Sequence, residues 1–380
     1  MSTSTDSASP PLAGRGFLRP ARELRATILP VSGLVILVVL FSALGDNFLA
    51  VNTAYTVLRE ASVVLVVSVG MTFVVLMGSI DLSVGATVTL SGLVAARVAE
   101  GYEWGTAVGA GILAGCAIGV VNGLIFAYAK VPSFLTTLGT SLAISGLALW
   151  YVGGRPVQIS DQSFLGISQS SWIGNIPNIA LWAFLVWAAF SLLGLHTRFG
   201  RYTYAIGGGE AVSRLAGIPV QRYKFEAMVL SGTLADVGGV LLAARVGAAT
   251  PGMGDRLTLL AIAAVVMGGT ALTGGVGGVY RTILGVLVIT VLASIFSPKG
   301  KAKNAVSGAR RHAVEYLDLN YETDMNERDK IFAAMCREEN EIRKLPEKYK
   351  RLIRNETEFL DLLRNAHIEH DKAQVRAAQD

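Results

Sequence analysis

Long apolar runs separated by short polar or glycine-rich segments fill most of the chain before residue 297. A helix needs roughly 20 apolar residues to cross a bilayer, and nine runs approach that length. We therefore predict an all-α fold, a polytopic transmembrane helical bundle of about nine spans. The predicted spans are Thr27–Leu44, Ala61–Ile80, Val84–Ala99, Thr106–Tyr128, Thr136–Tyr151, Ile179–Leu195, Phe225–Ala243, Leu257–Ala271 and Val279–Phe296.

A polar interruption at Gly78–Gly85 separates the second run from the third. Within it, Asp81 is the only ionisable residue between Glu60 and Arg97. A carboxylate in apolar sequence of bilayer length needs a partner, a water-filled cavity, a position at the membrane surface or a backbone terminus to cap. Asp81 could cap the next helix, tie helices together or contact a solute in a central pathway. Capping and tying are favoured, because such carboxylates are usually satisfied in these ways.

Composition places the chain among integral membrane proteins. Hydrophobic residues make up 52% of it and charged residues 16%, against about 25% charged residues in soluble domains. The net charge is +5, but the basic residues gather at the ends of apolar runs, as topology determinants do. Nucleic acid is therefore not an expected partner. The two cysteines, Cys116 and Cys336, suggest neither a disulfide framework nor a metal site.

The basic residues also predict the orientation. A leader over residues 1–26 carries four arginines before the first apolar run, and we expect it to stay in the cytoplasm rather than act as a cleaved signal peptide. Counting spans from there places Asp81 near the inner face and the Gly153–Asn178 loop outside. The most basic loop, His196–Lys224, then falls inside, as the positive-inside rule requires.

Motifs of catalysis are absent from the sequence. It has no GxxxxGK[ST] phosphate loop, no HExxH and no GxSxG, and its four histidines do not gather at metal-ligand spacing. We therefore predict no enzyme activity, no catalytic residue and no metal site. The pairs Gly268-Gly269 and Gly274-Gly275 are expected to allow close helix packing and a tight turn rather than to cradle phosphate.

The inside loop contains a second candidate site. Gly207–Gly209 is expected to interrupt the chain, and Glu210–Ala216 to form a short helix that Gly217 and Pro219 end. Such a helix on glycine joints suits docking into a groove of another protein. The alternative is a solvated connecting loop whose arginines fix the topology, and the residues alone leave both open.

Five separated motifs, in the same order, resemble the ribose-type permeases of bacterial ABC sugar importers over about residues 29–296. Gly209 departs from that pattern, since the family usually has Asn there. The motifs are Gly70-Met71-Thr72 with Gly78–Gly85, Asn122-Gly123, Pro132–Thr140, Gly200-Arg201 with Ala205–Gly208, and Ala261–Thr270 with Thr273–Gly277.

The resemblance implies a membrane-spanning permease subunit of an importer in the bacterial inner membrane. Its substrate would be a monosaccharide, a ribose-like pentose or a hexose, delivered by a periplasmic binding protein. Two cytoplasmic ATPase subunits would bind the ATP, a second permease subunit would complete the channel, most simply as a homodimer, and this chain would bind no cofactor.

The resemblance also turns the short cytoplasmic helix into a coupling helix. Arg201, Glu210 and Arg214 are the expected contacts with the ATPase. The full set of expected coupling residues is Gly200, Arg201, Ala205, Ile206, Gly207, Gly208, Glu210, Arg214 and Gly217.

Neutral polar side chains are expected along the translocation pathway, because a neutral sugar requires hydrogen bonds and no counter-ion. The alternative for each of these polar groups is a hydrogen bond between helices, and for the aromatic residue an interfacial anchor. The residues predicted for the pathway or its core are Asp81, Ser83, Asn122, Phe134, Thr136 and Thr137.

The last 84 residues differ in character from the permease domain, residues 27–296. They hold 17 of the 33 Lys and Arg and 16 of the 28 Asp and Glu, but only 2 of the 42 glycines. We predict a basic linker, Lys299–Arg311, and two or three amphipathic helices in place of the last span of the family. A fusion or a frame shift would produce such a tail, residues 297–380, whose role stays open.

Two other functions remain open from the sequence. The chain could be a permease for another small solute, such as a branched-chain amino acid. It could also be a membrane-anchored interaction module that acts through its tail.

Overall fold

A computed structural model of the protein describes residues 31–39, 51–174, 176–296, 329–333, 335–337 and 364–370. Its contacts divide the chain into two units, Met1–Leu292 and Ala293–Asp380, and each is described by itself. The predicted leader and the predicted basic linker lie outside the described residues.

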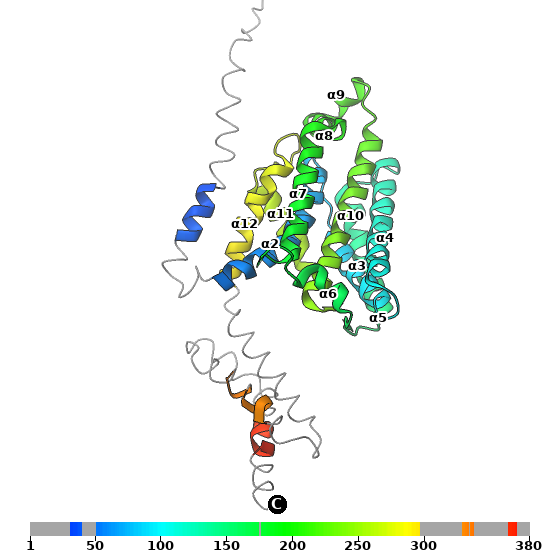
Figure 1. Ribbon diagram of the computed structural model, residues 1–380. Helices are drawn as coiled ribbons and strands as arrows, with labels where there is room; N and C mark the ends of the chain where they lie inside the picture. The colour runs from blue at the N-terminus through cyan, green and yellow to red at the C-terminus, as the bar shows by residue number, and fades with distance from the viewer. Residues whose placement is uncertain are drawn as a thin grey trace, which may run out of the picture. The chain divides into compact units, whose positions relative to one another are not determined.

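Helices form most of the described part of the first unit, which confirms the all-α prediction (Figure 1). A helical segment over residues 31–39 comes first. The elements that follow are α2 (Val51–Leu76), α3 (Val84–Val98), α4 (Trp104–Gly123), the π-helix η1 (Leu124–Tyr128), α5 (Ser133–Val152), β1 (Val157–Gln158), α6 (Gln162–Gln169), α7 (Asn178–His196), α8 (Arg198–Gly208), α9 (Glu210–Leu215), α10 (Val220–Val246), β2 (Ala248–Ala249), α11 (Asp255–Met267) and α12 (Val279–Phe296).

A helix lies at each of the nine predicted spans, although not every one is a full crossing by length. Among the described residues, five helices are long and apolar enough to cross a membrane, namely those at Ala54–Leu76, Trp104–Tyr128, Ser133–Val152, Asn178–His196 and Val220–Val246. By contrast, α3 has 15 residues and α11 has 13. At about 1.5 Å per residue they rise roughly 20 Å, less than the hydrocarbon core of about 30 Å. These two helices therefore cover only part of the bilayer.

Two segments expected as loops contain helices. The Gly153–Asn178 segment, which was predicted to lie outside, contains α6. The first turn of α6 is capped by Asp161 Oδ1, which accepts a hydrogen bond from Ser163 N at 2.8 Å. The basic segment expected inside holds α8 as well as α9, and Thr197 Oγ1 caps α8 by accepting from Gly200 N. Both helices are too short to appear in a search for membrane-length apolar runs. They lie at opposite ends of the helical unit (Figure 1).

The central helix of the unit is α10, which makes its most extensive contacts with α4, α2 and α3. Small residues allow this close approach. A Cβ added to Gly232 of α10 would lie 2.8 Å from the carbonyl oxygen of Gly115 in α4, and one added to Gly119 would lie 2.9 Å from Met228 O. Backbones packed this closely gain dispersion contacts that compensate for the weak hydrophobic drive between helices in lipid.

A glycine junction joins the ends of α2 and α8 to the turn between α11 and α12. Gly275 N donates to Leu76 O at 2.9 Å, and a Cβ on Gly207 would lie 1.8 Å from the same carbonyl oxygen. Gly274 and Gly275 have φ values of +84° and +73°, which glycine adopts without strain. The predicted tight turn at these two residues is therefore confirmed.

The described parts of the second unit are helical. Phe332 stacks on His370 with ring centroids 3.6 Å apart, and Met335 and Ala366 are fully buried. The predicted tail helices are thus seen only in these short segments, and the rest of that prediction lies outside the described residues.

The glycine junction generates the first prediction. Gly207→Ala should destabilise the protein by about 1–3 kcal/mol or more, because the new methyl group meets a backbone oxygen that cannot move aside. Gly208→Ala is the matched control, since beyond the adjacent residues and the backbone of α8 itself no atom lies within 4 Å of a Cβ at that position. The unfolding midpoint of the detergent-solubilised protein, at one fixed heating rate, measures both. Equal midpoints for the two variants would contradict the junction.

Candidate functional site

The polar turn, residues 78–85, lies at the end of the unit that carries α8 and α9. The side chain of Asp81 stabilises it. Asp81 is 2% exposed. Its Oδ1 accepts hydrogen bonds from Ser83 N at 2.9 Å and Ser83 Oγ at 2.6 Å, and its Oδ2 accepts from Ser231 Oγ of α10 at 2.8 Å. Asp81 therefore both satisfies a backbone N–H at the start of α3 and ties that start to α10.

Further side chains satisfy the polar turn from three more helices. Asn122 Nδ2 of α4 donates to Ser83 Oγ at 2.8 Å. The backbone N–H of Leu82 donates to Thr137 Oγ1 of α5 at 2.9 Å, and that of Gly85 donates to Thr258 Oγ1 of α11 at 2.9 Å. Four helices thus converge on one turn, each through a hydrogen bond that water would otherwise have to supply.

The predicted pathway residues separate into two groups. Ser83, Asn122 and Thr137 join Asp81 in this network, where their hydrogen bonds connect helices. Thr136 is also buried, and its hydroxyl, like Asn122 Oδ1, has no hydrogen-bond partner among the described residues. Phe134 is 55% exposed and lies outside the network.

A second buried carboxyl group, which the sequence analysis missed, lies in the middle of α10. Asp236 is fully buried and its carboxyl group lies against α4, where a Cβ on Gly115 would come within 1.7 Å of Asp236 Oδ1. Its backbone carbonyl accepts a hydrogen bond from Ser91 Oγ of α3 at 3.1 Å. The signal that could have found it is the single charge in the apolar run Ser231–Ala244.

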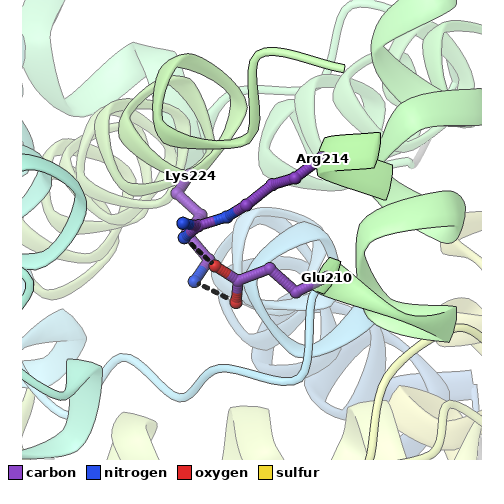
Figure 2. A network of polar contacts seen from close by, with 3 residues as sticks. All are labelled: Glu210, Arg214 and Lys224. Carbon is purple, nitrogen blue, oxygen red and sulfur yellow. Dashed lines mark hydrogen bonds and ion pairs between the residues drawn. The ribbon is translucent and has the colours of Figure 1, made fainter. Parts of the chain in front are cut away.

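An ion-pair network fixes α9 to α10 (Figure 2). The carboxylate of Glu210 pairs with Arg214 one turn further along α9, and its other oxygen lies 2.7 Å from Lys224 Nζ of α10. The ammonium group of Lys224 also lies 4.9 Å from the ring centroid of Phe126 in η1. Partial burial alone would raise the pKa of Glu210, but the hydrogen bonds from Lys224 and Arg214 lower it below its ordinary value.

The break between α8 and α9 is narrower than predicted. Gly207 and Gly208 belong to α8, and only Gly209 separates the two helices. Its φ of 172° is an extended conformation that other residues adopt. The backbone therefore does not require glycine at this position, whereas Gly217, with φ +77°, ends α9 in the left-handed region that favours glycine.

The predicted coupling residues lie partly inside the unit and partly on its surface. Ile206 is 2% exposed and packs with Val74 and Met228, and Gly200 sits where a Cβ would lie 1.9 Å from Gly194 O of α7. Arg201 is exposed and donates to His196 O, at the end of α7, at 3.3 Å. The other exposed members are Ala205, Gly208, Arg214 and Gly217.

The most exposed apolar side chains of this region were not among the predicted residues. Val212 is 70% exposed and Leu215 is 90% exposed, both on α9. Three residues apart, they lie on one side of the short helix. Val212 and Leu215 therefore form a small apolar surface on a helix whose position is fixed. We name this surface the α9 patch.

Comparisons with known proteins give a consistent result. The family model described as branched-chain amino acid transport system / permease component matches residues 53–313. The ribose import permease protein RbsC of Escherichia coli (strain K12) is 38% identical over 273 residues, 68% of this chain and 82% of the relative. That of Bacillus subtilis (strain 168) is 38% identical over 266 residues, 69% and 82% of the two chains.

A relative with another sugar in its name is also similar. The L-arabinose ABC transporter permease protein AraH of Azospirillum brasilense is 33% identical over 264 residues, 68% of this chain and 77% of the relative. No solved structure is a significant match to the chain.

The network at the polar turn generates the second prediction. Asp81→Asn should keep near-normal amounts of folded protein in the membrane, because the amide still accepts from Ser83 and can donate to Ser231 Oγ. Asp81→Leu should lower that amount strongly, since it leaves buried donors unpaired at about 1–3 kcal/mol each. Membrane abundance and the unfolding midpoint are the measurements.

Ser231→Ala, which removes one of three donors, should lie between the two variants. If Asp81→Asn is as unstable as Asp81→Leu, the capping and tying roles are wrong. If it folds normally but transports nothing, Asp81 acts in the pathway.

Proposed function

The chain belongs to the family of branched-chain amino acid transport system permease components, and from this membership we propose that it is the membrane-spanning permease subunit of a bacterial ABC importer for a monosaccharide. The observation that carries this conclusion is the 38% identity to ribose import permease proteins over 82% of their length. It confirms the resemblance first found in the five motifs. The chain is accordingly a multi-pass membrane transport subunit and not an enzyme.

A ribose-like pentose is the favoured substrate, with a hexose as the broader alternative. Relatives named for ribose and for L-arabinose support a sugar. The family description names branched-chain amino acids, which makes an amino acid the substrate to test against. The match to permeases begins at residue 53 and ends at residue 313, so most of it lies in the predicted permease domain, residues 27–296, which supports a function carried by that domain.

The driving force comes from a partner chain. Cytoplasmic ATPase subunits bind the ATP and contact the α9 patch. A periplasmic binding protein delivers the sugar at the opposite end of the unit, near α6. The exposure of Val212 and Leu215 supports this contact. The ion pair between Glu210 and Lys224 fixes α9 to α10, so these apolar side chains are already positioned to bind in a groove of a partner. This orientation places the N-terminus in the cytoplasm.

The polar turn belongs to the core of the permease rather than to its open pathway. Its side chains bond one another and the backbone, so a sugar could reach them only if the helices separated. A second permease subunit, most simply in a homodimer, completes the channel. Much of α5 and α7 is free to contact it, since only 22% of each span is buried within one chain.

The α9 patch generates the third prediction. The double variant Val212→Ser/Leu215→Ser should lose at least about tenfold in the amount of ATPase subunit that co-purifies, because each apolar side chain buried in a groove contributes about 1.5–3 kcal/mol. Ala211→Ser, also exposed on α9, is the matched control and should bind normally. Charge reversal at Arg201, on the neighbouring helix α8, should also reduce the amount of ATPase subunit that co-purifies. Undiminished co-purification with the double variant would rule out the patch as the docking site.

Substrate choice generates the fourth prediction. Cells that express the chain with its ATPase and binding protein should take up labelled ribose or arabinose faster than a labelled hexose, and should not take up leucine. Uptake should stop when the ATPase subunit cannot hydrolyse ATP. Uptake of leucine in place of the sugars would make the chain an amino-acid permease.

A further inference from the structure

A polar pocket of about 630 Å³ lies where the ends of α3 and α5 meet β1. This volume falls within the roughly 300–1,000 Å³ of small-molecule sites. Both helices start at the polar turn and run away from it, since α3 begins at Val84 and Leu82 N donates to Thr137 Oγ1 near the start of α5. The pocket therefore lies at the end of the unit where the proposed orientation places the periplasmic binding protein.

A short two-stranded sheet holds one wall of the pocket in place. β1 pairs with β2 in antiparallel register, with Gln158 opposite Ala248, and Ile159 N donates to Gly247 O at 2.9 Å. Side chains alternate along a strand, and accordingly Val157 is buried whereas Gln158 is exposed. The side-chain amide of Gln158, which lines the pocket, is thus presented by paired backbone.

The charged side chains of the lining supply both donors and acceptors. Arg97 Nη1 pairs with Glu100 Oε2 at 2.7 Å, which leaves Glu100 Oε1 able to accept. Among the described residues, the guanidinium group of Arg155 has no hydrogen-bond partner, and Ser160 adds a hydroxyl group to the wall. Such a set matches the hydroxyl groups of a sugar, because each of them donates one hydrogen bond and accepts others.

An aromatic ring is also part of the lining. Tyr151, near the end of α5, is 39% exposed and lines the pocket. The face of its ring is apolar and its hydroxyl group is polar, so it can pack against the C–H face of a sugar ring and still offer a hydrogen bond. An aromatic ring, a neutral amide and charged groups of both signs together favour a neutral solute with many hydroxyl groups.

We propose that this pocket is a low-affinity binding site for the transported monosaccharide at the outer entrance of the pathway, an inference that deepens the proposed function and rests on it. Only 22% of the α5 span is buried within one chain, so this helix is free to line a channel between two subunits. A site on a transport route has to release its solute again. The exposed side chains of Gln158 and Arg155 exchange their hydrogen bonds with water, which keeps the binding weak.

An anionic solute fits the pocket less well. The carboxylate of Glu100 lies in the lining and offsets one of the two guanidinium groups, that of Arg97. The competing assignment is a docking surface for acidic side chains of the binding protein. Sugar binding in the absence of that protein separates the two.

The test is saturation-transfer NMR on the full chain in lipid nanodiscs, without ATPase or binding protein. Ribose should give a saturable signal and leucine none. Gln158→Ala should weaken the ribose titration about fivefold, the value of one hydrogen bond of about 1 kcal/mol, and Tyr151→Ala should weaken it at least as much. Gln162→Ala and Tyr102→Ala are the matched controls and should leave it unchanged, because both residues are exposed and neither lines the pocket.

No ribose signal from the unaltered chain, or equal titrations for the pocket variants and their controls, would overturn the proposal. Normal ribose titrations combined with weaker capture of the binding protein would overturn it as well, and would make the pocket a docking surface. Gln158→Ala decides the matter if Tyr151→Ala fails to fold. Since the NMR readout needs no transport, the two failures are distinct: leucine uptake in place of sugars refutes the proposed function, whereas ribose uptake with equal titrations refutes only the pocket.

Discussion

In a bilayer, buried backbone and side-chain polar groups depend on the protein itself for their hydrogen bonds, and the turn between α2 and α3 meets this constraint at several positions at once. Gly78 is exposed, but Asp81 and Ser83 are buried, so donors at the buried positions of the turn would be left open without side-chain acceptors. Asp81 accepts three hydrogen bonds there, while Thr137 and Thr258 accept from the backbone. The convergence of α4, α5, α10 and α11 on this point follows from that requirement.

The same end of the unit connects the proposed docking surface to the core. Lys224 of α10 pairs with Glu210 on α9, and Ser231, seven residues further along α10, bonds Asp81. Seven residues are two helical turns, so both side chains lie on one side of α10. The glycine junction adds a second link, since α8 meets the end of α2 at Gly207. A displacement of α9 on ATPase binding would therefore act on α10 and on the polar turn through packed contacts.

Helix positions could be predicted well because a membrane helix is a long, contiguous apolar run. The short helices α6 and α8 could not be predicted from apolar runs, because their formation depends on caps at Asp161 and Thr197 and on packing against the larger helices. Asp236 escaped because a single carboxyl group does not end an apolar run. Its burial depends on Gly115, 121 residues earlier in the chain, which leaves room for it.

The sequence by itself determined the class of protein, the places of the helices, the tight glycine turn and the family motifs, because each is encoded in residues that are near one another along the chain. It also narrowed Asp81 to three roles. Only the tertiary structure decided which groups meet Asp81, which glycines touch a backbone and which apolar side chains of α9 remain outside. The reason is distance along the chain: Ser231 is 150 residues from Asp81, and no local pattern specifies a hydrogen bond between side chains that only folding brings together.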